Sequence, residues 1–154
     1  MFDQYQAVFK SLNSHGVKYL VIGGVAAIAY GSDRSTYDLD ILIEPTLANA
    51  TNLLKALAQV EFGTAHMTTP EKVLASEITK FRDWVVVDVQ TSTPGITFEE
   101  AWNRRETGTA HGVTVVYVAL DDLIASKVAA GRPKDLGDVA FLTSDSVSPR
   151  PLGQ

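Results

Sequence analysis

The sequence contains no cysteine and only three histidines among its 154 residues. Without cysteine, the chain can form neither disulfide bonds nor thiolate metal sites. His15, His66 and His111 are scattered singly and lack the spacing of metal ligands, so no histidine site is predicted. The sequence also has no apolar run of the length of a membrane span or of a secretory signal. We therefore expect a cytoplasmic protein without a membrane partner.

Basic residues are fewer than acidic ones, with 13 Lys and Arg against 18 Asp and Glu, for a formal net charge of −5. This balance argues against a protein that coats nucleic acid through bulk electrostatics, although a local basic patch stays open. The apolar fraction of 45% is ordinary for a globular protein, and the chain is long enough for one core. We predict a single domain over residues 1–143, followed by a flexible, polar and proline-containing tail over 144–154.

Strand-like and helical patterns alternate along the chain. Short apolar runs rich in branched residues predict strands at 17–22, 37–43, 77–81, 84–90 and 113–118. Apolar residues at helical spacing predict helices at 2–14, 25–30, 47–60, 97–104, 121–130 and 133–142. Residues 61–70 are poorly defined, and a short strand is expected around 62–66. Residues 71–76 could form one helical turn. The alternation predicts an α/β (α+β) domain with a mixed, twisted sheet flanked by helices.

The most informative stretch runs from Val17 to Glu44. It consists of a strand, the glycine pair Gly23-Gly24 that opens a helix, a polar link, and a strand that carries Asp38 and Asp40. Residues two apart on a strand point to the same side, so these two carboxylates repel each other unless a cation lies between them. Oxygen ligands of this kind suit Mg²⁺. The glycines would allow backbone N–H groups to approach a phosphate. The stretch therefore predicts a site for a metal-bound nucleotide.

Asp88 is the single acid in the apolar strand predicted at 84–90. An unpaired charge there would cost several kcal/mol. If this strand lies beside the Asp38/Asp40 strand, three carboxylates converge and can hold two Mg²⁺ ions, or one metal plus a base for an attacking hydroxyl. Taken alone, Asp88 could instead be an edge-strand charge or a partner of Arg82 or Arg104. A solvated strand end would explain the other two acids.

The order of these features resembles the polymerase-β-like nucleotidyltransferase superfamily, which has a glycine pair, a D-x-D strand and a later acid on an adjacent strand. Residues 34–41, RSTYDLDI, are similar to the R-x-T-x-D-L-D-I form of small prokaryotic proteins related to AbiEii-type toxins. Residues 122–127 and 130–138 are similar to a later L-I-x-x-K…R-x-K-D-x-x-D segment. The resemblance covers residues 17–142.

The resemblance implies a role for each matching residue. Catalysis and binding of one or two Mg²⁺ ions would fall to Asp38, Asp40 and Asp88. Nucleotide binding would fall to Gly23, Gly24, Arg34, Thr36, Lys127 and Lys134. From the residues alone, Lys127 could instead pair with an acid, and Lys134 could lie on a solvated helix start.

The activity implied by the resemblance is Mg²⁺-dependent transfer of a nucleoside monophosphate from an NTP to a hydroxyl. The acceptor could be an RNA end, a protein or a small molecule, and the setting could be a toxin–antitoxin pair with an antitoxin protein as partner. Two alternatives stay open. One is a catalytically silent module of the same fold that binds a nucleotide or a partner, and the other is a metal-dependent phosphohydrolase.

Overall fold

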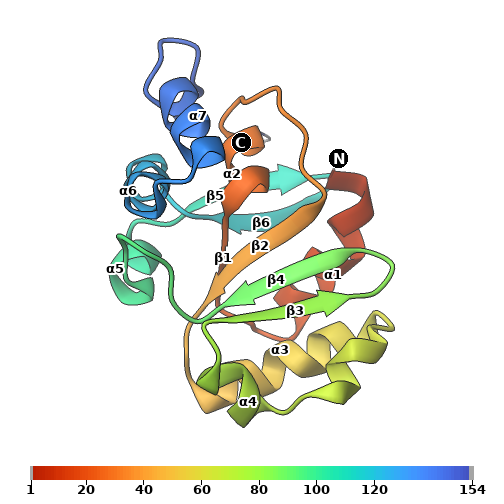
Figure 1. Ribbon diagram of the computed structural model, residues 1–154. Helices are drawn as coiled ribbons and strands as arrows, with labels where there is room; N and C mark the ends of the chain where they lie inside the picture. The colour runs from red at the N-terminus through yellow and green to blue at the C-terminus, as the bar shows by residue number, and fades with distance from the viewer. Residues whose placement is uncertain (1, 153–154) are drawn as a thin grey trace.

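The structure is a computed structural model in which residues 2–152 are described. Six strands form one sheet in the order β3-β4-β2-β1-β6-β5, with helices around it (Figure 1). The strands are β1 (Tyr19–Ile22), β2 (Asp38–Ile43), β3 (Ile78–Arg82), β4 (Val86–Gln90), β5 (Glu106–Ala110) and β6 (Val113–Tyr117). The β1–β6 and β2–β4 pairs are parallel and the other three are antiparallel, so the predicted mixed sheet is confirmed.

The helices follow the predicted periodic segments closely. They are α1 (Gln6–Ser14), α2 (Gly23–Ala29), α3 (Leu47–Gln59), α4 (Pro70–Ala75), α5 (Phe98–Asn103), α6 (Leu120–Ala130) and α7 (Pro133–Leu142), with 3-10 helices η1 (Phe2–Tyr5) and η2 (Gly63–Met67). Thr46 caps α3 by accepting a hydrogen bond from the Asn49 amide at 3.2 Å, and Pro133 opens α7. Within residues 2–152, no helix combines the length and the apolar character that crossing a membrane requires.

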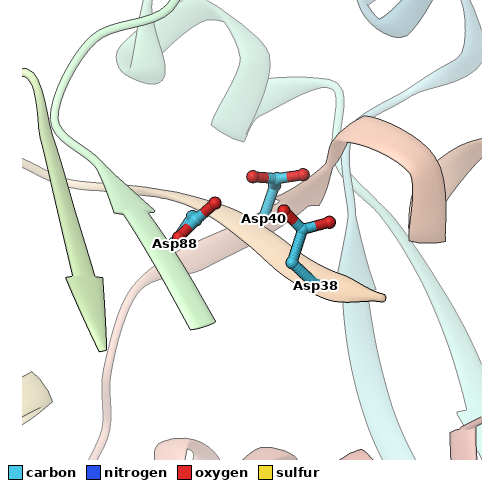
Figure 2. Close-up of side chains that lie close together, drawn as sticks. All are labelled: Asp38, Asp40 and Asp88. Atoms are coloured by element: carbon cyan, nitrogen blue, oxygen red, sulfur yellow. The ribbon is translucent and has the colours of Figure 1, made fainter. Parts of the chain in front are cut away.

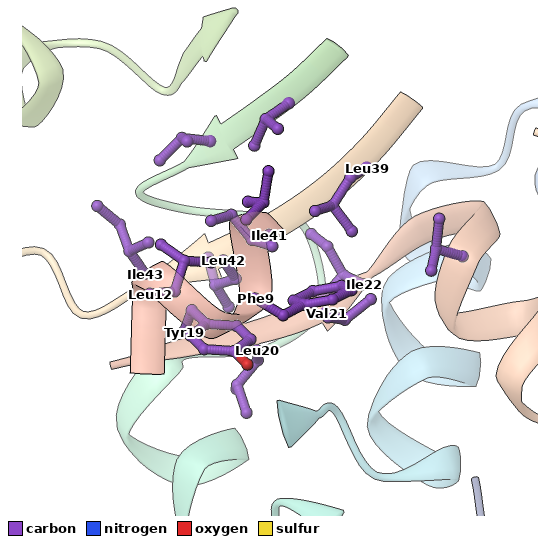
Figure 3. Close-up of a cluster of buried hydrophobic side chains, with 14 of the residues drawn as sticks. Phe9, Leu12, Tyr19, Leu20, Val21, Ile22, Leu39, Ile41, Leu42 and Ile43 are labelled. Atoms are coloured by element: carbon purple, nitrogen blue, oxygen red, sulfur yellow. The ribbon is translucent and has the colours of Figure 1, made fainter. Parts of the chain in front are cut away.

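The two faces of the sheet differ in what they carry. All four residues of β1 are buried, and the Tyr19 ring stacks on Phe9 of α1 with centroids 6.2 Å apart (Figure 3). Val21 lies opposite Ile41 of β2, whereas Ile22 lies opposite Asp40. Because alternate residues of a strand point to opposite faces, Asp38 and Asp40 emerge on the face of β2 opposite to the buried Leu39 and Ile41.

The strand expected around 62–66 is wrong, because this segment forms the 3-10 helix η2. The backbone amides of Gly63 and Thr64 donate to the Asp83 carboxylate at 3.0 and 3.3 Å, which satisfies them without a neighbouring strand. No strand is expected from the pattern of residues 106–110, yet they form β5 at the sheet edge. Gly108 of β5 lies against the Leu152 carbonyl oxygen, so β5 also packs against a segment that is distant in the sequence.

Residues 148–152 return to the end of α2. The Ser148 amide donates to the Tyr30 carbonyl at 2.9 Å, and the Leu152 amide donates to the Ala29 carbonyl at 2.8 Å. Pro151 is buried. The predicted division into a domain over 1–143 and a flexible tail stays a prediction, and residues 153–154 lie outside the described residues.

Candidate active site

Three carboxylates meet on one face of the sheet. The parallel pairing of β2 and β4 places Asp40 directly opposite Asp88, and Asp38 lies two residues earlier on the same face of β2. One oxygen from each of the three side chains lies within 4.8 Å of the others. Figure 2 shows the three carboxylates close together above the two strands. The convergence of the three acids required that their two strands be neighbours, which the sequence left open, and the structure pairs these strands directly.

Asp40 is in an unfavourable electrostatic position as an anion. The pKa of Asp40 is raised from 3.8 to about 7, first by burial and then by the negative charges of Asp38 and Asp88. Lys134 and Lys80 oppose this rise only in part. Carboxylates that are crowded together and removed from water gain most from a divalent cation with oxygen ligands.

The oxygens of the other two acids show where such an ion fits. Asp88 is 4% exposed. Its Oδ2 accepts a hydrogen bond from Lys80 Nζ at 3.1 Å, whereas its Oδ1 is buried and has no hydrogen-bond partner in the described part of the chain. Asp38 Oδ1 accepts from the Thr36 hydroxyl at 3.2 Å. A buried carboxylate oxygen without a partner is costly, and a metal ion would satisfy it. The donor set therefore fits Mg²⁺.

The glycine pair provides room for this cluster. Gly23 has a φ of +67°, and a Cβ at this position would lie 2.4 Å from Asp40 Oδ2. A Cβ on Gly24 would lie 2.7 Å from the Arg34 guanidinium and 2.9 Å from the Thr36 hydroxyl. Gly23 thus permits the position of Asp40, and Gly24 permits the packing of two residues from the following loop.

We expect Gly23→Ala to be more damaging than Gly24→Ala. At position 23 alanine adds about 1–2 kcal/mol of left-handed backbone strain and a clash with the Asp40 carboxylate. Gly24 has no positive φ, so alanine at position 24 meets only the Arg34 and Thr36 side chains and adds no left-handed backbone strain. Urea unfolding of both variants measures the difference in stability. Equal losses of stability would contradict the special role of Gly23.

Lys127 and Arg34 share one acid on α7. Lys127 is 4% exposed, and its Nζ lies 2.6 Å from Asp138 Oδ2 and 3.8 Å from Asp135 Oδ1. The Arg34 Nε and Nη2 atoms donate to the same Asp138 carboxylate at 2.7 and 2.9 Å. Both predicted nucleotide ligands are therefore engaged with acids of this chain, and the pairs join the loop before β2 to α6 and α7.

Arg132 and Lys134 flank Pro133 at the start of α7. Arg132 Nε donates to Asp135 Oδ2 at 2.6 Å. Burial alone would raise the pKa of Asp135, but the hydrogen bond and charge of Arg132, with the charge of Lys127, hold it below 3.8. Lys134 makes no ion pair within residues 2–152 and lines the space next to the carboxylates. It is a cation available to an anionic ligand.

Two hollows open on either side of the cluster. Asp38, Asp88, Lys80 and Lys134 line both of them. The first hollow is further lined by Ile22, Gly23, Asp40, Gln90, Lys127 and Arg132, among others. The second is further lined by Arg34, Ser35, Thr36, Tyr37, Arg82 and Val86. The structure thus brings the predicted site residues to one region, with Gly24 behind Arg34 and Thr36.

Two ion pairs of this region were not predicted from the sequence. Lys80 contacts Asp88 across the β3–β4 hairpin, and only the register of that hairpin could have indicated the pair. From the sequence, the helix dipole alone would explain an acid at Asp138 near the start of a helix. The pair with Arg34 could not be found in this way, because the two residues are 104 positions apart.

The fold is that of nucleotidyltransferase-like proteins. It is similar to a crystal structure from Thermotoga maritima assigned as a nucleotidyltransferase, at 13% identity and a TM-score of 0.58, over 87% of this chain and 86% of that one. It is also similar to an antigenic nucleotidyltransferase-like protein from Paracoccidioides brasiliensis, at 15% identity and a TM-score of 0.54, over 89% of this chain and 72% of that one.

The sequence identifies the family more narrowly. The family described as "Nucleotidyl transferase of unknown function (DUF2204)" matches residues 1–144, and the chain belongs to it. No curated protein matches the chain.

Proposed function

We propose that this protein transfers a nucleoside monophosphate from an NTP to a hydroxyl acceptor, releases pyrophosphate and requires Mg²⁺. The observation that carries the proposal is the cluster of Asp38, Asp40 and Asp88, with one buried oxygen left unpartnered, in a chain of a nucleotidyltransferase family. The fold alone would not separate an active enzyme from a silent relative. The cluster favours activity because it is costly to the folded protein unless it binds a cation.

Each acid has a task in this reaction. Asp38, Asp40 and Asp88 would hold one or two Mg²⁺ ions, and the bound metal supplies positive charge to the triphosphate oxygens. The acceptor oxygen would attack the α-phosphorus while the bond to pyrophosphate breaks, and Asp88 would help to activate the acceptor hydroxyl, whose proton passes to water. Such a transfer depends on in-line positioning and charge neutralisation rather than on covalent catalysis.

The arrangement of the two hollows supports transfer over hydrolysis. Two substrates must approach the α-phosphorus from opposite sides, and the carboxylates lie where the two hollows meet. We place the triphosphate on the side of Gly23 and Arg132, with Lys134 beside it. The acceptor then lies on the side of Tyr37 and Arg82. Whether the acceptor is an RNA end, a protein or a small molecule is decided by experiment.

The direct test incubates the pure protein with each NTP, labelled at the α-phosphate, together with Mg²⁺, total RNA and lysate protein. We expect label in one acceptor band and release of pyrophosphate, both lost in Asp38→Asn. Asp145→Asn is the matched control, because Asp145 is exposed and lies outside both hollows. Orthophosphate release without labelled acceptor would favour a phosphohydrolase. Mg²⁺-dependent NTP binding without turnover would favour the silent module.

The similarity of residues 34–41 to AbiEii-type proteins supports a further part of the proposal, a cytoplasmic toxin with an antitoxin partner. Expression in a bacterial host should then slow growth, and Asp38→Asn should relieve the effect. Growth that is unaffected by the wild-type protein at the same expression level would contradict the toxin setting while leaving the transfer reaction testable.

Metal binding is expected to depend on pH because of Asp40. Its pKa of about 7 means that a proton must leave before the carboxylate can serve as a ligand. Below pH 7 the affinity for Mg²⁺ should therefore fall by about tenfold per pH unit, and above pH 8 it should level off. Calorimetric titration between pH 5.5 and 8.5 measures this. An affinity independent of pH over that interval would contradict the role of Asp40 as a ligand.

A further inference from the structure

Lys80, Asp88 and Asp40 form a row across three strands. The β3–β4 register places Lys80 opposite Asp88, and the β2–β4 register places Asp88 opposite Asp40. Residues that lie opposite each other share a face of the sheet, so the lysine emerges on the face that carries the acids. Its side chain is 51% exposed, yet its Nζ lies 3.1 Å from Asp88 Oδ2. The ammonium group of Lys80, on the edge strand β3, thus pairs with the least exposed acid of the cluster.

The two oxygens of Asp88 have different surroundings. Oδ2 is held by Lys80, whereas Oδ1 is buried and without a hydrogen-bond partner within residues 2–152. In Figure 2, one oxygen of Asp88 points toward Asp40 and Asp38, and the other points toward β3. Rotation of the carboxylate about its terminal bond by less than a half-turn would move both oxygens away from these positions. The contact with Lys80 opposes that rotation because it would break the ion pair.

We propose that Lys80 is a positioning residue for Asp88, which holds Oδ2 so that Oδ1 is presented to the metal between Asp38 and Asp40. The inference rests on the proposed metal site and assigns to it a residue outside the three acids. Hydrogen-bonded partners of metal ligands orient those ligands, and their removal typically weakens metal binding by about 10–100-fold. Lys80 would orient the Asp88 carboxylate and would touch neither the metal nor the reacting atoms.

A simpler explanation predicts the opposite sign. Lys80 could be one of the charged residues that protect sheet edges, without a role at the site. Its positive charge would then only repel a bound cation, so its removal would strengthen metal binding. The direction of the change in metal affinity therefore separates positioning from plain electrostatics.

Arg82 offers a matched control on the same strand. It lies two residues from Lys80 on the same face of β3, lines the second hollow, and makes no ion pair in the described part of the chain. Arg82→Met removes one positive charge close to the cluster without removing a contact to Asp88. Its effect on metal affinity measures the general electrostatic contribution, against which the Lys80 variants are compared.

The experiment titrates the full chain with Mn²⁺, as a spectroscopic substitute for Mg²⁺, at pH 8 and without nucleotide. We expect Lys80→Met to weaken Mn²⁺ binding about tenfold, Lys80→Arg to retain most of the affinity because it keeps a donor, and Arg82→Met to leave it unchanged or slightly tighter. Urea unfolding without metal checks that each variant is folded, and Lys80→Ala replaces Lys80→Met if the latter fails to fold.

Each outcome has a distinct meaning. Affinity that is unchanged or tighter in Lys80→Met, or in Lys80→Ala where it replaces that variant, would overturn the positioning role, while the metal site itself would stand. Equal weakening in Lys80→Met and Arg82→Met would also overturn it, because the effect would not depend on the contact. Absence of Mn²⁺ binding by the wild-type protein would overturn the metal site of the proposed function instead.

Discussion

Asp40→Asn is expected to abolish metal-dependent transfer and, at the same time, to stabilise the metal-free protein. The loss of activity should be about 10³-fold or more, because a neutral amide replaces an anionic ligand where the reaction requires charge neutralisation. The gain in stability follows from the raised pKa of this group. In the wild-type protein the carboxylate must ionise among Asp38 and Asp88 while mostly removed from water. Asparagine removes that charge.

The gain should depend on pH in a defined direction. The folded protein holds the Asp40 proton up to about pH 7, whereas the unfolded chain releases it near 3.8. Between these values the folded state binds more protons, so the stability of the wild-type protein falls as pH rises. We expect no difference between the two proteins near pH 4, and a gain of about 2 kcal/mol for Asp40→Asn at pH 8, discounted for partial solvation of the side chain.

Urea unfolding with a metal chelator at pH 4 and pH 8 measures this effect, and Asp145→Asn serves as the control that removes an exposed charge. Stability that is lower in Asp40→Asn than in the wild-type protein at pH 8 would contradict the electrostatic account of the cluster. A stabilised variant that still transfers nucleotide would contradict the catalytic assignment alone. Stability and activity thus test separate parts of the argument.

Asp138→Ala is expected to cause the largest loss of stability, about 3–5 kcal/mol, because it leaves buried cations without their partner. Asp138 is 3% exposed and serves both Lys127 and Arg34. After its removal, Asp135 at 3.8 Å is the one acid within residues 2–152 that still pairs with the Lys127 ammonium, which is 4% exposed. The guanidinium of Arg34 loses both of its contacts with α7, so the loop before β2 should also loosen.

A double-mutant cycle identifies the cause of that loss. If the penalty arises from the unpaired lysine, Lys127→Met combined with Asp138→Ala should recover much of the stability lost in Asp138→Ala alone. Urea unfolding of the single and double variants provides the numbers, and Asp145→Asn should change stability by less than about 0.5 kcal/mol. A loss of under about 1 kcal/mol in Asp138→Ala would show that the ion pairs contribute little to stability. Lys127 could then leave Asp138 and bind the nucleotide at little cost.

The acids of the site could be predicted because their signal is local. Asp38 and Asp40 alternate with apolar residues on one strand, and Asp88 interrupts an otherwise apolar one. Period-two alternation fixes the face to which each side chain points, whatever the rest of the chain does. The same local rules placed the glycine pair at the junction of β1 and α2. What these rules leave undetermined is which strands become neighbours.

Other parts of the structure depend on contacts that no local pattern contains. Residues 106–110 include polar and glycine positions without clear alternation, yet they pair with β6 as β5. The segment around 62–66 has aromatic and small residues that read as a strand, but the Asp83 carboxylate binds its amides and a 3-10 helix forms instead. In both cases a distant partner outweighs local propensity.

The sequence by itself determined the alternation of strands and helices, the three acids and the glycines that make room for them, because each depends on residues only a few positions apart. The tertiary structure decided that β2 lies beside β4, that Lys80 reaches Asp88, and that Asp138 takes up both Arg34 and Lys127. These pairings join residues up to 104 positions apart. The physical reason is that strand order, register and the burial of charge are settled only when the whole core packs.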